Sequence, residues 1–147
     1  MIKIMFVCHG NICRSPMAEF IFKDMLKKCG RESEFIVASS ATSTEEIWNG
    51  IGNPVYPPAK SELAKHGISC EGKIAVQLKK SDYDKYDLFP CMDSRNVTNT
   101  MRIFGSDPDH KVRKLLKNKD VSDPWYTDKF DVAYNDIYKG CKGLLKE

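Results

Sequence analysis

The run of residues 7–16, VCHGNICRSP, constrains the fold of this chain more than any other stretch. The apolar, β-branched-rich residues 2–7 that lead into it predict a buried strand. A helix is predicted to follow, because Pro16 suits the first helical position and Ser15 suits its N-cap. Residues 8–15 should therefore form a loop from the end of a strand to the start of a helix. Such a junction favours an anion, since free backbone N–H groups and the helix dipole both attract negative charge.

The side chains in this loop suit the attack of a nucleophile on a bound oxyanion. Cys8 opens the loop, where the helix N-terminus and Arg14 stabilise a thiolate that is reactive near neutral pH. The planar fork of Arg14 matches two oxygens of a phosphate or a similar oxyanion. Gly10 and Asn11 are residue types that tolerate a positive φ, which a loop curled around an anion needs. The Ser15 hydroxyl can donate to the Cys8 sulfur and stabilise it both as attacker and as leaving group.

Length and charge limit the kind of protein that carries this loop. The 147 residues suffice for one domain with a real core, so a single domain over residues 1–147 is expected. The 23 basic and 20 acidic residues leave a net charge of +3, which is too small to indicate nucleic acid or a membrane surface as a partner. No signal or transit pattern precedes the first strand, and no apolar run is long enough to span a membrane. A cytoplasmic protein is expected.

The cysteines and histidines do not indicate a disulfide framework or a zinc site. The chain has six cysteines, but without a secretion signal we expect them to stay reduced. Only Cys8 and Cys13, with four residues between them, are spaced as a zinc ligand pair, no second pair follows, and the three histidines, His9, His66 and His110, are scattered. We therefore expect no metal and no cofactor.

The hydrophobic pattern beyond the loop predicts strands that alternate with helices. Helices are expected at residues 16–29, 57–66, 96–104, 111–116 and 130–145, and further strands at 34–39, 74–78 and 87–92. A strand, a helix and a strand in succession form a right-handed parallel unit. The predicted fold is therefore an α/β three-layer sandwich, with a four-stranded parallel sheet and helices on both faces. Pro90 is unusual inside a strand, so a bulge or an edge-like pairing is expected there.

Five residues separate Cys8 from Arg14, and Ser15 follows, which resembles the phosphate loop of cysteine-dependent phosphatases. The fuller run, close to the N-terminus, is similar to that of the low-molecular-weight protein tyrosine phosphatase family. The resemblance extends over nearly the whole chain and is weakest in residues 72–91, where Val76 stands in place of the family's arginine. It implies that a phosphotyrosine-containing protein or a small aryl phosphate is the substrate. It also implies that the phosphate contacts the loop residues, which are His9, Gly10, Asn11, Ile12, Cys13 and Ser15.

A second motif contains a candidate for the group that protonates a leaving phenolate. Residues 121–126 are VSDPWY, and Pro124 stiffens this segment and favours an extended conformation at Asp123. In the resembled family, an Asp-Pro-aromatic-Tyr segment near the C-terminus carries the general acid, which implies that role for Asp123. Proton transfer by such a group contributes roughly 10²–10⁴-fold to a rate. Trp125 and Tyr126 are expected to line one side of the cleft.

Three further residues are candidates for the surroundings of the site. In the family, a serine at the position of Ser40 holds the asparagine of the loop, here Asn11, in its strained conformation. Trp48 lies in the polar loop of residues 39–56, where it either packs the loop down or forms a wall of the substrate cleft. Asp93 follows a predicted strand, so it either lies near the active site at the carboxyl end of the sheet or caps a helix.

Two other functions use a similar loop. An arsenate reductase coupled to thioredoxin needs two further relay cysteines. Cys91 at a strand end suits one of them, but Thr98 stands where its partner is needed. A non-catalytic phosphate-binding module has no use for Cys8, Arg14 and Asp123 together.

Cys13 suggests a redox hypothesis. It lies five residues after Cys8 on the curled loop, so it could form a disulfide with an oxidised Cys8 and protect it from over-oxidation. The alternative is that Cys13 is a small residue that fits the buried loop. We expect the protein to be a monomer, with a weak dimer as the alternative.

Overall fold

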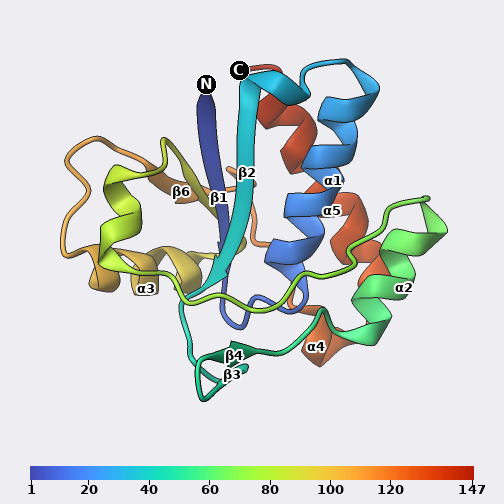
Figure 1. Cartoon of the computed structure of the whole chain (residues 1–147), viewed down its shortest axis with the longest axis horizontal. Coiled ribbons are helices and arrows are strands. Elements are labelled where there is room, and N and C mark those ends of the chain that lie inside the picture. The colour runs from blue at the N-terminus through green and yellow to red at the C-terminus, as the bar shows by residue number, and fades with distance from the viewer.

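A four-stranded parallel sheet forms the centre of the fold (Figure 1). The structure is a computed structural model that describes all 147 residues. The strands are β1 (Ile2–Cys8), β2 (Phe35–Ala41), β5 (Phe89–Cys91) and β6 (Val112–Lys114), and they lie in the order β2-β1-β5-β6. The longest ladder joins β1 to β2, from Ile2 beside Phe35 to Cys8 beside Ala41. The carboxyl ends of these two strands therefore meet at the same edge of the sheet.

Helices and shorter elements surround this sheet. The helices are α1 (Arg14–Lys28), α2 (Pro57–Lys65), α3 (Ser94–Phe104), α4 (Pro124–Thr127) and α5 (Phe130–Leu145), with the 3-10 helices η1 (Glu32–Glu34) and η2 (Lys80–Asp84) and a hairpin of β3 (Ile47–Trp48) and β4 (Ile51–Gly52). Both chain termini lie at one end of the sheet, and α4 and the hairpin lie at the other (Figure 1). None of the helices is both long enough and apolar enough to cross a membrane.

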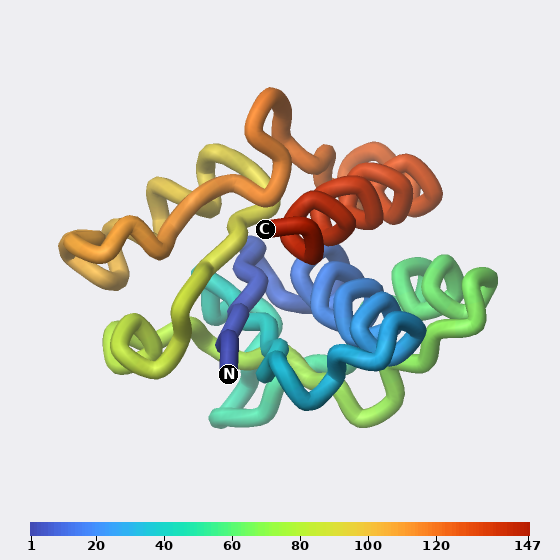
Figure 2. The backbone as a smooth tube through the Cα atoms, turned by 90° about the horizontal axis from the view of Figure 1, so that it is seen from above, coloured from blue at the N-terminus to red at the C-terminus, as the bar shows by residue number.

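The side chains of β1 alternate between the two faces of the sheet, and a hydrophobic core covers each face. Ile4, Phe6 and Cys8 belong to the larger core, which α1 and α5 cover. Met5 and Val7 belong to a smaller core on the other face, to which α3 contributes. Figure 2 shows α1, α2 and α5 together on one side of the sheet and α3 on the other. The predicted α/β sandwich, with a four-stranded parallel sheet and helices on both faces, is confirmed.

The helix after the loop begins two residues earlier than predicted. Arg14 is its first residue and Cys13 occupies the N-cap, so the expectation that Ser15 caps the helix is wrong. Ser15 lies instead in the first turn, where its hydroxyl reaches the Cys8 sulfur. The last helix has the predicted bounds, and its buried stripe contains the expected Phe130, Tyr134, Ile137, Cys141 and Leu144.

Residues 74–78 do not form the strand that their apolar side chains predict. They contact the end of β2 through one isolated parallel bridge. The backbone N–H groups of Ala75 and Val76 donate to Asn53 and to the Asn11 side chain. Because loop residues engage these donors, the ladder does not continue along β2.

The fourth strand is β6, which lies within residues 111–116, where a helix is expected from the sequence. The segment KVRKLL has apolar residues at helical spacing. It is extended because Phe89, Pro90 and Cys91 of β5 pair with it in parallel. Pairing with a strand distant in the sequence overrides such a weak local preference.

Pro90 lies in an interior strand, neither at a sheet edge nor at a bulge. Strand β5 pairs with β1 on one side and with β6 on the other. Its register with β1 is the same at Ile4–Leu88 as at Val7–Cys91, whereas a bulge would shift it. The ladder has a gap at Pro90 because proline has no N–H. The expectation of a bulge is therefore wrong, whereas the alternative, an edge-like local pairing, is found, because Pro90 pairs with Arg113 of β6 but with no residue of β1.

Candidate active site

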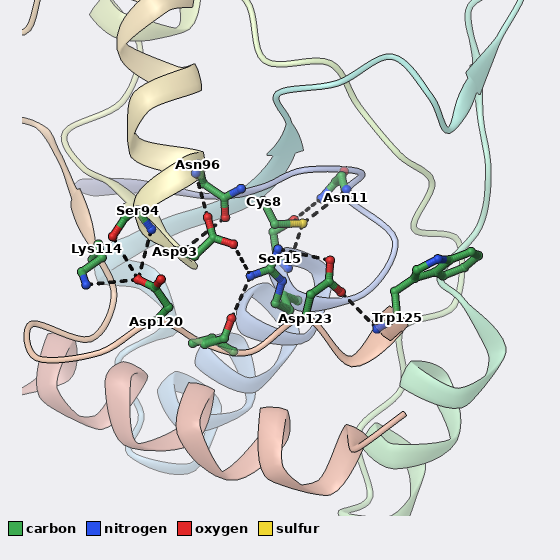
Figure 3. Close-up of polar contacts among 12 residues, drawn as sticks. Cys8, Asn11, Ser15, Asp93, Ser94, Asn96, Lys114, Asp120, Asp123 and Trp125 are labelled. Atoms are coloured by element: carbon green, nitrogen blue, oxygen red, sulfur yellow. Dashed lines mark hydrogen bonds and ion pairs between the residues drawn. The ribbon is translucent and has the colours of Figure 1, made fainter. Parts of the chain in front are cut away.

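The loop of residues 8–15 joins β1 to α1 and curls around the Cys8 sulfur (Figure 3). The backbone nitrogens of Asn11 and Ser15 lie 3.3 and 3.4 Å from Cys8 Sγ, and the Ser15 hydroxyl lies 2.9 Å from it. Only 3% of Cys8 is exposed. Donors directed at a buried sulfur stabilise negative charge on it, and the N-terminus of α1 adds its dipole. The arrangement therefore suits a thiolate nucleophile.

Asn11 holds the loop in its curled conformation. Its φ of 59° lies in the left-handed region, which asparagine tolerates better than most residues. Asn11 Nδ2 donates to Ser15 Oγ at 2.7 Å and to Ser39 Oγ at 2.9 Å. Asn11 Oδ1 accepts from the backbone N–H of Val76 at 3.0 Å, and Ser39 in turn donates to Glu19 of α1 at 2.6 Å. These bonds offset a backbone strain of about 1–3 kcal/mol.

Ser39 makes the contact that was expected of Ser40. Side chains alternate along β2, and the register pairs Ser39 with Phe6 and Ser40 with Val7. Phe6 faces the larger core, as Cys8 does, whereas Val7 faces the smaller one. Ser40 therefore points away from the loop, and its buried hydroxyl makes no hydrogen bond. The expectation that Ser40 supports the loop is wrong.

The loop offers unpaired backbone donors to an anion. The N–H groups of Gly10, Ile12 and Cys13 donate to no acceptor in the chain. A curled loop with free N–H groups beside a helix N-terminus is an anion site. Gly10 does not have the positive φ that was expected for it. The absence of a side chain at Gly10 leaves room for Glu46 instead, because a Cβ at Gly10 would lie 3.2 Å from Cγ of Glu46.

Arg14 is buried beside the loop, and 3% of its side chain is exposed. Arg14 Nη1 lies 2.7 Å from Asp93 Oδ2 and 2.8 Å from the carbonyl oxygen of Val121. Arg14 Nη2 lies 3.5 Å from Asp123 Oδ2. Burial by itself lowers the pKa of Arg14, but the negative charge of Cys8 and the hydrogen bond to Asp93 outweigh this effect and raise it. The guanidinium is therefore a fixed cation beside the loop that holds Cys8.

Asp93 has both of the roles considered for it. Its Oδ1 accepts from the backbone N–H of Asn96 at 2.7 Å and so caps α3, and the Asn96 side chain accepts from the Asp93 backbone at 3.2 Å. Its Oδ2 forms the ion pair with Arg14. Because this carboxylate follows β5 directly, the carboxyl end of the sheet orients the cation of the loop.

Asp123 lies beside the loop and caps the short helix α4. Its Oδ1 accepts from the backbone N–H of Trp125 at 3.1 Å, while its Oδ2 is the atom nearest to Arg14 Nη2. Its side chain is 27% exposed. The carboxyl group therefore reaches both solvent and the neighbourhood of Cys8, as a group that exchanges protons with water and substrate must (Figure 3).

The loop and Asp123 line one cavity of about 130 Å³. The lining consists of residues 8–14 of the loop, Glu45, Glu46, Asp123, Trp125 and Tyr126. The Trp125 ring packs on Tyr56 with a centroid distance of 4.8 Å, and Tyr126 is 84% exposed at the rim. Two aromatic side chains beside the anion site suit an aryl group attached to the bound oxyanion.

Another part of the cavity wall is acidic and comes from the segment that leads into the β3–β4 hairpin. Glu45 Oε2 lies 3.0 Å from His9 Nε2, and Glu46 accepts from the Asn53 side chain at 3.0 Å. Trp48, in contrast, is not part of the lining and is 72% exposed. The structure therefore places Trp48 neither in the cavity wall nor under the loop.

Burial keeps the other cysteines near the site in the thiol form. Burial and the nearby negative charge of Cys8 raise the pKa of Cys13, which also lines the cavity. Burial likewise raises the pKa of Cys91 to about 12. Cys91 belongs to the smaller core, on the face of the sheet away from Cys8, and contacts Thr100. All six cysteines are free.

Sequence reasoning missed Ser39, Glu45, Glu46 and the carbonyl of Val121. Alternation along β2 places Ser39 and Ser40 on opposite faces, and the register with β1 then selects Ser39. The two glutamates carry no such signal. They occur in a polar loop, and only the folded hairpin brings them to the cavity.

Known proteins resemble this chain in sequence and in structure. A sequence model of the family described as low molecular weight phosphotyrosine protein phosphatase matches residues 3–147. The low molecular weight protein-tyrosine-phosphatase YfkJ of Bacillus subtilis is 36% identical over 151 residues, covering 99% of this chain and 94% of YfkJ. The crystal structure of YfkJ superposes with a TM-score of 0.92 at 35% identity, over 99% of this chain and 93% of that one. The structure of Vibrio vulnificus Wzb in complex with benzylphosphonate gives a TM-score of 0.84 at 26% identity, over 99% and 97% of the two chains.

Proposed function

Because the chain belongs to the low molecular weight phosphotyrosine protein phosphatase family, we propose that it hydrolyses phosphotyrosine and small aryl phosphates through a phosphocysteine at Cys8. The observation that carries the proposal is the Cys8 sulfur, which has three hydrogen-bond contacts inside a cavity that Arg14 and Asp123 also line. The ligand of the Vibrio vulnificus relative, benzylphosphonate, carries a phosphonate beside an aromatic ring. It supports an aryl phosphoryl group as the ligand of this cavity.

In the first step, the phosphate dianion binds to the free N–H groups of the loop and to Arg14. The Cys8 thiolate attacks phosphorus in line, so that an S–P bond forms while the P–O bond to the phenolate breaks. Negative charge on the three equatorial oxygens meets the N–H groups and the guanidinium. The Asp93 ion pair holds Arg14 in place before the substrate arrives, so little reorganisation is needed.

Asp123 acts in both steps. As the carboxylic acid it protonates the leaving phenolate, and phenol departs. As the carboxylate it then takes a proton from a water molecule that attacks the phosphocysteine. The S–P bond breaks, inorganic phosphate leaves, and the Cys8 thiolate returns with Ser15 donating to it. All the residues with these roles belong to one chain, so the reaction as proposed needs no second copy.

An arsenate reductase relay is less well supported by the contacts near the loop. A relay cysteine must reach the sulfur that has reacted with arsenate. Cys91 is fully buried and lies on the other face of the sheet from Cys8. Its use would require that the smaller core opens.

The test is hydrolysis of phenyl phosphate from about pH 4 to about pH 8, with a chelator present, by the wild type, Asp123→Asn and Cys8→Ser. We expect metal-independent hydrolysis, a loss of about 100-fold in Asp123→Asn, and no turnover but retained phosphate binding in Cys8→Ser. Asp128→Asn is the matched control, because Asp128 is exposed and its φ of 60° suits asparagine. Absence of hydrolysis, together with arsenate-dependent oxidation of thioredoxin, would contradict the proposal.

A further inference from the structure

A second aspartate lies in the same loop as Asp123 and fixes that loop to two other elements. Asp120 Oδ1 accepts from the backbone N–H and from the hydroxyl of Ser94, each at 3.1 Å, and from Lys114 Nζ at 3.1 Å. Ser94 is the first residue of α3, and Lys114 is the last residue of β6. Figure 3 shows the three side chains together, apart from the sulfur and beside the ion pair of Asp93. We call Asp120, Ser94 and Lys114 the loop latch.

The residue after the latch is fixed through its backbone. The Val121 N–H donates to the carbonyl of Met92 at 2.8 Å, and the Val121 carbonyl accepts from Arg14 at 2.8 Å. Val121 is 1% exposed. The chain then passes through Ser122 to Asp123, where Pro124 limits the backbone. Only two residues lie between Asp120 of the latch and Asp123. The latch therefore holds the start of the short stretch of chain that positions the Asp123 carboxyl group.

The backbone of Val121 and one ion pair also hold this loop, and the latch adds to them. Residues 117–123 have no regular secondary structure. Lys119 pairs with Asp136 of α5, but the Lys119 side chain is 61% exposed, and a lone exposed pair holds its partners loosely. The Asp120 side chain is also 49% exposed, but it has three donors from two elements. Partial burial alone raises the pKa of Asp120, but the hydrogen bonds from Lys114 and Ser94 outweigh this and lower it, so the latch stays charged in mildly acid solution.

We propose that Asp120 is a positioning residue for proton transfer by Asp123. The inference rests on the proposed function, in which Asp123 is the general acid. Asp120 itself is not part of the cavity lining, so it acts only through the backbone of residues 121–123. A misplacement of about 1 Å at a reacting group can cost up to about 100-fold in rate. Loss of the latch should therefore weaken proton transfer while phosphate binding and attack by Cys8 remain.

Proton transfer can be separated from the other steps by the choice of leaving group. A phenolate is strongly basic and needs a proton as it leaves, whereas a dinitrophenolate is weakly basic and leaves without one. The ratio of kcat/KM for dinitrophenyl phosphate to kcat/KM for phenyl phosphate therefore reports how well the general acid is placed. A change that disturbs the phosphate loop lowers both values and leaves this leaving-group ratio unchanged.

The experiment measures the leaving-group ratio in the wild type, Asp120→Ala and Asp123→Asn. For Asp120→Ala we expect a fall of about tenfold in kcat/KM for phenyl phosphate and of less than about twofold for dinitrophenyl phosphate. Asp109→Ala is the matched control, because it removes the same charge from an exposed position whose side chain makes no hydrogen bond; its ratio should equal that of the wild type. Asp120→Asn keeps an oxygen acceptor for Ser94 and should recover part of the loss.

A double variant tests whether the latch acts as one unit. Lys114→Met alone should shift the leaving-group ratio in the same direction as Asp120→Ala. In Asp120→Ala/Lys114→Met the two effects should not add, because the second change removes a contact that is already lost. Additive effects would show that Asp120 and Lys114 do not act as one unit, which would contradict the latch as proposed.

The outcomes distinguish this inference from the function on which it rests. If the wild type hydrolyses neither ester, the proposed function and the inference both fail. If Asp123→Asn leaves the ratio unchanged, Asp123 is not the general acid and the inference fails with that assignment. If Asp123→Asn shifts the ratio but Asp120→Ala does not, or if Asp120→Ala lowers both rates equally, only the positioning role of Asp120 is overturned.

Discussion

Arg14 Nη1 lies 2.7 Å from Asp93 Oδ2, and this ion pair joins the loop of residues 8–15 to the start of α3. The Arg14 side chain is 3% exposed and that of Asp93 is 20% exposed. A buried guanidinium without a partner would lower the stability of the fold. The ion pair therefore contributes mainly by leaving no buried charge unpaired, and less through the attraction between the two groups. It also fixes the direction in which the cation faces the cavity.

Replacing Asp93 should affect both stability and activity. Asp93→Ala removes the partner of Arg14 and the cap of α3, so the free energy of unfolding should fall by about 2 kcal/mol. A guanidinium that is no longer held in place should also lower kcat/KM for an aryl phosphate by about 100-fold. Asp93→Asn keeps an acceptor for the cap and should recover most of the stability but not the activity. Urea unfolding and initial rates measure the two effects; unchanged rates in Asp93→Ala would show that Arg14 is positioned without it.

The neighbouring hydroxyls of Ser39 and Ser40 provide a matched pair of variants. Ser39→Ala removes an acceptor from Asn11 and a donor to Glu19, so the strained loop loses support and kcat/KM should fall by about tenfold. Ser40→Ala removes a buried hydroxyl that makes no hydrogen bond, so kcat/KM should change by less than about twofold. Initial rates with an aryl phosphate measure kcat/KM for both variants. Equal losses in the two variants would contradict the role given to Ser39.

Two cysteines of the loop should differ in their reaction with iodoacetate. The thiolate is the reactive form, and a raised pKa keeps Cys13 protonated at neutral pH. The Cys8 sulfur has three hydrogen-bond contacts and lines the cavity, which suits a nucleophile. Peptide mapping after brief alkylation should therefore find the label on Cys8 and not on Cys13, and phosphate should protect Cys8. Preferential labelling of Cys13 would contradict this assignment.

Gly52 should not tolerate a side chain, because the hairpin approaches the backbone of Ala75 there. A Cβ at Gly52 would lie 2.0 Å from the Ala75 carbonyl oxygen. Gly52→Ala should therefore lower the free energy of unfolding by about 2 kcal/mol. Gly143→Ala is the matched control: it is helical and no atom lies within 4 Å of its Cβ, so the same change should raise stability by about 0.5 kcal/mol. Urea unfolding of the two variants should give opposite signs, and equal effects would contradict the close approach.

Much of the site is predictable because its chemistry is local in the sequence. Cys8, Arg14 and Ser15 belong to one loop, and the strand before it and the helix after it follow from short-range patterns. The partners that orient these groups come from elsewhere in the chain. The pair of Arg14 with Asp93 depends on β5 lying beside β1, which no local pattern specifies.

The errors in the fold have the same origin. Residues 111–116 have helical spacing, and only pairing with β5 makes β6 extended. Residues 74–78 have the composition of a strand, but their N–H groups are engaged by Asn11 and Asn53. In both cases a tertiary contact determines the backbone, and the local sequence is compatible with more than one outcome. The last helix could be predicted because its stripe of apolar side chains at helical spacing is enough to specify a helix.

The proposed mechanism requires that Cys8 carries the phosphoryl group during turnover. Rapid acid quenching of the wild type with a nitrophenyl phosphate, followed by peptide mass mapping, detects that intermediate. We expect a burst of nitrophenol equal to the enzyme concentration, with the phosphoryl group on Cys8 and no burst in Cys8→Ser. A phosphoryl group on another residue, or turnover that persists in Cys8→Ser, would contradict it.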